Sequence, residues 1–185
     1  LGASATEGMH KVINELLKWR DDLQRKHQNP SFAITSPTMN IGSIHGGDNP
    51  NRICSHCETQ IDIRPLPGMD IDTLRADLQK RLNNILSIDS KLTLAHRPIF
   101  AGVPAFETAA NAKLTQMVES LTGKKAEAVA FGTEAPFLNR LGLETLVVGP
   151  GNIDQAHQAN EYIPADQITP YCNFMQKIIS NICIK

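Results

Sequence analysis

The sequence predicts an α+β domain in its first part and part of an α/β domain in its second part. In the first hundred residues, helical and strand periodicities follow one another in the order αββαβ, which is typical of helices packed on an antiparallel sheet. After Phe100, short apolar strand-like segments alternate with helical segments, which indicates an α/β arrangement. We therefore divide the chain into residues 1–99 and residues 100–185.

Chain length, composition and net charge argue against several classes of protein. The chain has 185 residues, 41% of them hydrophobic, which is enough for a folded core. A net charge of −1 without basic runs argues against a nucleic-acid partner, and no apolar run reaches the length of a membrane span. The N-terminal sequence resembles no signal peptide, so we expect a cytoplasmic protein. It also lacks an initiator Met, and we expect a piece of a longer protein.

The first helix is predicted to begin in a capping box formed by residues 4–7 and to end near His27, before Asn29 and Pro30. The apolar residues on one face of this helix are Met9, Val12, Ile13, Leu16, Leu17 and Leu23.

Two strands follow, over residues 38–45 and 52–64, joined by a loop of turn-forming residues over 46–50. In the second strand, the odd-numbered positions from Ile53 to Ile63 would share one face of the sheet.

A second helix is predicted after Asp70 or Asp72, either of which can cap it. Its apolar stripe consists of Leu74, Leu78, Leu82 and Ile85. Residues 91–97 then alternate like a third strand.

In the second part, a helix over residues 111–121 closes with Gly123. The segments 126–130 and 144–148 are predicted strands. A final helix begins at Thr169 and Pro170. Its predicted buried side consists of Tyr171, Cys172, Met175, Ile178, Ile179 and Ile182.

Cys54 and Cys57 form a C-x-x-C pair. A structural zinc site needs four ligands, and residues three apart on a strand point to opposite faces. A thioredoxin-like pair would lie at a helix start. We therefore interpret the pair as ordinary reduced strand cysteines, and His56 between them as a surface residue.

Two positively charged or titratable residues of the first part are candidates for a site. His45 ends a strand beside a Gly-Gly loop, a common place for a catalytic group. Arg64 lies between apolar residues, where a partly buried guanidinium would need a carboxylate. The alternative for Arg64 is an ion pair with Asp62 or Glu58.

Two further candidates lie in the second part. His157 follows a Gly-Pro-Gly turn at the end of a predicted strand, where ligands commonly bind in α/β domains. Glu134 lies at a predicted helix start, capped by Thr133, where the helix dipole favours a carboxylate with or without a function.

Three motifs together resemble one family: IHGGDNPNRICSHCETQIDIRPLPGM at residues 44–69, GTEAPF at 132–137 and GPGNIDQAHQANEY at 149–162. They are similar to bacterial acetylornithine deacetylases, which belong to the dinuclear zinc amidohydrolases and metallopeptidases. The resemblance implies that residues 1–99 are a ferredoxin-like lid, or dimerisation domain, whose first strand is missing. Residues 100–185 would be the C-terminal part of a zinc-peptidase-like catalytic domain.

The resemblance also implies an activity. The parent enzyme would hydrolyse N2-acetyl-L-ornithine to L-ornithine and acetate in arginine biosynthesis, as a homodimer paired through the lid. A desuccinylase or aminoacylase of the same family is an alternative, and so is a non-catalytic dimerisation fragment. The intact subunit would hold two zinc ions, with cobalt possible, and this piece few or none.

In the first part, the resemblance implies that His45 is catalytic and reaches the partner subunit's site to hold the oxyanion. Asn51 would line the substrate site, and Arg64 would pair with the substrate carboxylate.

In the second part, the resemblance implies that His157 is a metal ligand. Gly149 and Gly151 would shape the substrate pocket beside it, and Glu134 would contact substrate at a position whose residue varies in the family.

Overall fold

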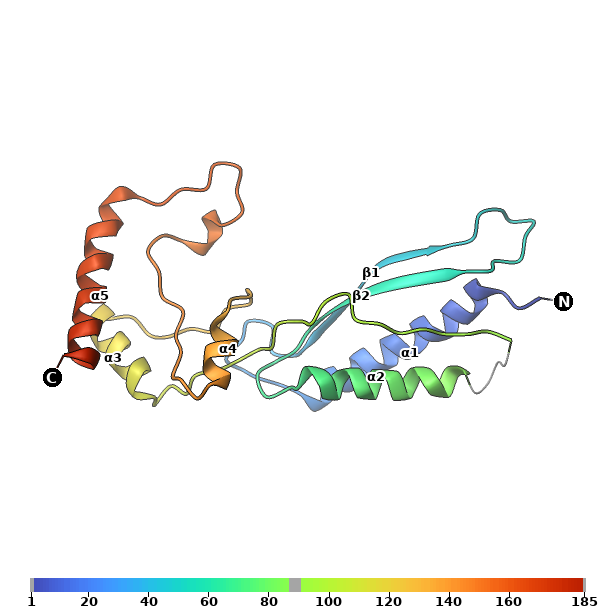
Figure 1. The fold of residues 1–185 in the computed structure, drawn as a ribbon, viewed down its shortest axis with the longest axis horizontal. Helices are drawn as coiled ribbons and strands as arrows, with labels where there is room; N and C mark the ends of the chain where they lie inside the picture. Colours follow the sequence, from blue (N-terminus) through green and yellow to red (C-terminus); the bar gives the residue numbers. More distant parts are fainter. Residues whose placement is uncertain (1, 87–90, 185) are drawn as a thin grey trace. The chain divides into compact units, whose positions relative to one another are not determined.

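A computed structural model describes residues 2–86 and 91–184 of the chain (Figure 1). These residues divide into two compact units. The first contains residues up to Glu107 together with Ala128–Thr133, and the second contains Thr108–Glu127 together with the residues from Glu134 onward. The predicted domain boundary between residues 99 and 100 stays a prediction.

Helix α1, Ala5–Lys26, confirms the first predicted helix to within a residue at each end. Its buried side consists of Met9, Val12, Leu16, Trp19 and Leu23. The predicted capping box does not form, because the Ser4 hydroxyl is hydrogen-bonded to the Thr6 hydroxyl at 2.8 Å and makes no cap to the backbone.

Strands β1, Thr38–Gly46, and β2, Cys57–Arg64, pair as an antiparallel hairpin. Their register matches Thr38 with Arg64 and Gly46 with Cys57, with one irregularity between Ile41 and Ser43. The second strand was expected from residue 52, and this start is wrong.

The reason for the late start of β2 lies in the loop before it. The Arg52 amide donates to the Asn49 carbonyl at 3.1 Å and closes a turn. The Ala5 amide donates to the Cys54 carbonyl at 2.8 Å, so this carbonyl is bonded to the start of α1 and not to the β1 ladder.

Helix α2, Ile71–Leu86, begins after Asp70, whose carboxylate accepts hydrogen bonds from the Thr73 amide and hydroxyl at 2.8 and 2.9 Å. Asp70 is therefore the cap, as one of the two predicted alternatives. In Figure 1, α1 and α2 lie side by side along the hairpin. The core between them is formed by the buried residues of α1 with Met39, Leu66, Met69, Leu78 and Leu82.

Residues 91–97 were predicted as a third strand, and the structure shows none there. The expected alternation is present: Leu92, Leu94 and His96 are half-buried and their neighbours are exposed. Leu94 packs against the core. What is missing is a ladder of backbone hydrogen bonds, because the sheet formed by the described residues contains only β1 and β2.

In the second unit, α3, Lys113–Thr122, ends at Gly123 in the left-handed conformation, as predicted. Helix α4, Ala135–Arg140, and α5, Ile168–Cys183, follow, with short 3₁₀ turns η1, Ile153–Gln155, and η2, Ala165–Gln167. The strands predicted at 126–130 and 144–148 do not form within the described chain. As for residues 91–97, no neighbouring strand forms a ladder of backbone hydrogen bonds with them.

The predicted buried side of α5 is only partly right. Tyr171, Met175 and Ile178 are half-buried, whereas Cys172, Ile179 and Ile182 are exposed. None of the helices in the described ranges is long and apolar enough to cross a membrane.

Candidate functional site in the hairpin and the His157 loop

The outer face of the hairpin carries the charged candidates of the first unit. Along β2, side chains alternate between half-buried and exposed, and Ile61 and Ile63 pack toward the helices. Glu58 and Arg64 therefore lie on the exposed face. His45 is directly opposite Glu58 in the register, and cross-strand partners share a face. His45 thus lies on the same outer face as Arg64.

His45 and Arg64 lie at opposite ends of that face. His45 pairs with Glu58, and Arg64, six positions further along β2, pairs with Thr38. At a rise of roughly 3.4 Å per residue, six positions separate the two residues by about 20 Å. The backbones of the two residues are therefore too far apart for the two side chains to contact each other directly.

The guanidinium of Arg64 has two partners in the structure. Its Nε lies 3.2 Å from Asp62 Oδ2, and its Nη1 donates to the Ala130 carbonyl at 3.3 Å. The side chain is 68% exposed, so the partly buried guanidinium expected from the sequence is not observed. The observed pair with Asp62 is one of the predicted alternatives, and an exposed pair of this kind contributes little to stability.

Asn51 lies in the exposed loop between β1 and β2. The backbone amide of Asn51 donates a hydrogen bond to Asn49 Oδ1 at 2.9 Å. An ion pair of 3.0 Å joins Arg52 to Asp48. The loop is thus held by its own polar contacts, with Asn51 at the surface and a few residues beyond His45.

His157 has an unusual backbone conformation. Its φ of 62° lies in the left-handed region that few residues other than glycine adopt, and it is alone in this among the described non-glycine residues. The conformation is supported by Glu161, whose carboxylate accepts a hydrogen bond from the His157 amide at 3.2 Å. Backbone strain of this kind is a recurrent property of functional sites.

The glycine turn before His157 is also tied down. Gly151 has a φ of 92°, and its amide donates to Gln167 Oε1 at 2.8 Å. Gly149 is exposed. Glu134 is exposed too, and it occupies the residue before α4, which makes Glu134 the N-cap where Thr133 was expected.

The described residues do not form a metal site by themselves. No group of three or more His, Cys, Asp or Glu side chains among them is arranged to hold a metal ion. His157 alone cannot fix a zinc ion, which needs at least three protein ligands in a catalytic site.

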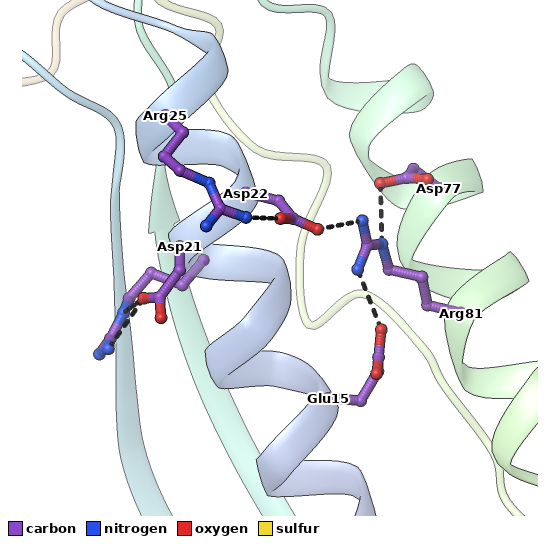
Figure 2. Close-up of polar contacts among 7 residues, drawn as sticks. Glu15, Asp21, Asp22, Arg25, Asp77 and Arg81 are labelled. Atoms are coloured by element: carbon purple, nitrogen blue, oxygen red, sulfur yellow. Dashed lines mark hydrogen bonds and ion pairs between the residues drawn. The ribbon is translucent and has the colours of Figure 1, made fainter.

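A charged cluster that the sequence analysis did not find joins α1 to α2 (Figure 2). Arg81 of α2 contacts Glu15 at 2.9 Å and Asp22 at 2.7 Å on α1, and Asp77 at 3.4 Å on its own helix. The Trp19 indole donates to Asp77 at 2.7 Å. The signal that could have found this cluster is the i, i+4 spacing of Asp77 and Arg81.

The hydrogen bond from Arg81, and then that from Arg25, hold the pKa of Asp22 below its ordinary value. The carboxylate form of Asp22 is thus favoured by the folded structure. The cluster links the two helices that pack against the hairpin.

Comparisons with known proteins give the chain a context. Residues 1–90 match the model of the M20 peptidase dimerisation domain. The chain is 44% identical over 183 residues to an acetylornithine deacetylase of Edwardsiella ictaluri and 43% identical over 185 residues to that of Pectobacterium carotovorum. It is 40% identical over 190 residues to that of Photorhabdus laumondii.

These alignments cover 98–99% of this chain and 47% of each relative. The chain therefore spans about half the length of the curated relatives that it matches.

Proposed function

We propose, from the match of residues 1–90 to the model of the M20 peptidase dimerisation domain, that the chain is part of an acetylornithine deacetylase. The whole protein would hydrolyse N2-acetyl-L-ornithine to L-ornithine and acetate, in the cytoplasm, as a step of arginine biosynthesis. The observation that carries this proposal is the 40–44% identity to enzymes of that name over nearly the entire chain.

The geometry of the hairpin supports a site shared between two subunits. His45 and Arg64 lie about 20 Å apart on one face, as the register requires. In a dimer, His45 of one subunit would donate a hydrogen bond to the oxyanion that forms at the partner's substrate. Arg64 would pair with the carboxylate of the amino-acid substrate, since a guanidinium presents a fork of donors to a carboxylate.

The remaining candidates are assigned to substrate binding. Asn51 would contact substrate from the exposed loop beyond His45. Gly149 and Gly151 would shape the pocket beside His157, where the turn is held by Gln167. Glu134 would face the same pocket from the start of α4.

We assign His157 as a metal ligand, in keeping with its strained and supported backbone. The other ligands would come from residues outside this chain, and the whole subunit would bind two zinc ions, with cobalt as an alternative. Bound zinc would lower the pKa of a water molecule to about 7 and so supply the nucleophile. This chain would contribute the imidazole at residue 157, held in place by the loop from Gly149 onward.

The test is a substrate panel on the complete protein that contains this chain. We expect release of acetate from N2-acetylornithine with a higher kcat/KM than release of succinate from an N-succinyl amino acid, or release of acetate from acetylmethionine. A preference for the succinyl substrate would favour the desuccinylase of the same family. Hydrolysis of none of the three, by protein that holds its metals, would overturn the proposal.

A second candidate is a dimerisation module without activity of its own. It is favoured by the match of residues 1–90 to a dimerisation domain. The two candidates separate in an assay of the complete, metal-loaded protein. Hydrolysis of acetylornithine supports the first candidate, whereas no hydrolysis of any substrate in the panel supports the second.

A further inference from the structure

The cysteine pair at the end of the hairpin has a different geometry from the one that the sequence suggested. Cys54 precedes β2, which begins only at Cys57. The opposite-face rule for residues three apart on a strand therefore does not apply to the pair. The Cys54 thiol donates to the His56 carbonyl at 3.0 Å, so its sulfur lies against the peptide group that joins His56 to Cys57.

The two sulfurs also lie against consecutive glycines of the facing strand end. A Cβ atom on Gly46 would stand 2.7 Å from Cys57 Sγ, and a Cβ atom on Gly47 would stand 3.9 Å from Cys54 Sγ. Both sulfurs therefore point toward the same short stretch of β1 and its turn.

The environments of the two thiols differ. Cys57 packs against the hydrophobic core, and Cys54 belongs to the loop. Burial raises the pKa of the Cys57 thiol, and the nearby negative charge of a Cys54 thiolate raises it further.

We propose that Cys54 and Cys57 form a reversible intrachain disulfide, with a low-molecular-weight disulfide such as oxidised glutathione as the oxidant. The Cys54 thiolate attacks one sulfur of the oxidant, forms a mixed disulfide and releases one thiolate. The Cys57 thiolate then attacks the Cys54 sulfur and releases the second thiolate. Two electrons pass to the oxidant, and the two protons end on the two released thiols.

The link would fix the end of the hairpin. Cys54 is tied to the start of α1 through the Ala5 amide, and Cys57 is the first residue of β2. A bond between them would fasten the loop that carries Asn51 to both elements, next to His45. In a reducing compartment such a bond is transient, so the pair would respond to oxidising conditions and recover afterwards.

The test measures oxidation of the chain by mass spectrometry. The variant C172S/C183S keeps only the pair, and the matched variant C54S/C57S keeps only the other two cysteines. Each is equilibrated at low protein concentration with mixtures of oxidised and reduced glutathione, quenched with acid, alkylated and digested with trypsin. Both cysteines fall in one tryptic peptide, because no Lys or Arg lies between them. This peptide runs from Ile53 to Arg75, since the bond between Arg64 and Pro65 resists cleavage.

In the variant that keeps the pair, we expect this peptide to be lighter by two hydrogens and not alkylated. The internal bond should form at a proportion of oxidised glutathione at least about tenfold lower than that needed for mixed disulfides in C54S/C57S, because closure is intramolecular. The single variant C57S should instead accumulate glutathione on Cys54. Alkylation of both cysteines throughout, or glutathione on both without an internal link, would overturn the proposal.

Discussion

Single residues of the hairpin carry the parts of the proposed function that are easiest to test. His45 and His157 belong to different compact units of the chain, and the register keeps His45 about 20 Å from Arg64. The proposed site shared between subunits would account for this separation, because His45 and Arg64 of one chain would then act on substrates bound to different copies.

In the complete enzyme, we expect His45→Ala and His157→Ala each to abolish most activity. Loss of one oxyanion donor alone costs about a hundredfold to a thousandfold in rate. When the two variants are unfolded and refolded together, activity should return, because one site in a mixed dimer is then free of both substitutions. If His45 served its own subunit, every site would keep one substitution and mixing would restore nothing.

Gly46 is a second residue whose role can be read from its surroundings. A Cβ atom there would stand 2.9 Å from Cys57 Cβ and 3.0 Å from Cys57 Cα, which belong to the partner strand and cannot move easily. We expect Gly46→Ala to lower the free energy of unfolding by about 1–3 kcal/mol. Urea unfolding followed by the fluorescence of the single tryptophan, Trp19, measures this.

The control for Gly46 is Gly132→Ala. Gly132 has ordinary φ, and a Cβ atom there meets nothing within 4 Å. Equal unfolding midpoints for the two variants would show that the closeness of Gly46 to β2 has no energetic consequence.

At the scale of elements, helices were easier to foresee than strands. The helix α3 and its end at Gly123 agree with the sequence pattern because a helix satisfies its hydrogen bonds internally. A strand depends on a partner that the local sequence does not specify. Residues 91–97 show the expected alternation of burial, yet no ladder joins them to β1 or β2.

The same limit applies to the candidate site. The sequence pointed to His45 and Arg64, but their distance follows from the register, which local periodicity does not give. The Arg81 cluster was missed because its carboxylates Glu15 and Asp22 lie on a helix about sixty residues earlier in the chain.

The pairing of α1 with α2 should depend on pH. The pKa of Asp22 is lowered below its ordinary value of 3.8 by its hydrogen bonds with Arg81 and Arg25. A lowered pKa in the folded state means that this stabilisation is present above about pH 4 and is lost as the pH falls through the folded-state pKa. We expect the urea concentration at the unfolding midpoint, reported by Trp19 fluorescence, to decrease when the pH is lowered below about 4. The decrease should be smaller in Asp22→Asn.

Arg81→Met should lower the same midpoint at pH 7, because Glu15, Asp22 and Asp77 then face one another without a cation. The matched variant is Arg20→Met, which removes an exposed ion pair between Arg20 and Asp21 within α1 and should change the midpoint little.

For the pH prediction, a profile of Asp22→Asn that coincides with that of the unsubstituted chain would show that the cluster does not cause the loss of stability in acid.

At the scale of the whole molecule, association is the first property to measure. Residues 1–90 match a dimerisation domain, and β1 is paired on one side only within the described residues. An open strand edge favours pairing with another chain. Light scattering on the peak from size-exclusion chromatography should give the mass of a dimer or a larger species. A monomer at every concentration tested would contradict self-association through residues 1–90.

Metal content is the second property of the whole chain. With His157 as its one assigned ligand, and no cluster of three candidate ligands in the described ranges, the chain should hold well under one zinc per molecule after dialysis. Elemental analysis with the His157→Ala variant alongside gives the background. Two metals retained per chain would contradict both the ligand assignment and the proposal that the other ligands lie elsewhere.

The irregularity between Ile41 and Ser43 decides which way His45 faces. The register passes from Ile41 opposite Ile61 to Ser43 opposite Gln60, so Gly42 is one extra residue without a partner. In an uninterrupted ladder, His45 would stand opposite Cys57 and turn toward the helices. The extra glycine shifts the alternation of side chains along β1 by one position. His45 therefore lies on the exposed face of the hairpin and not on the face that packs against the helices.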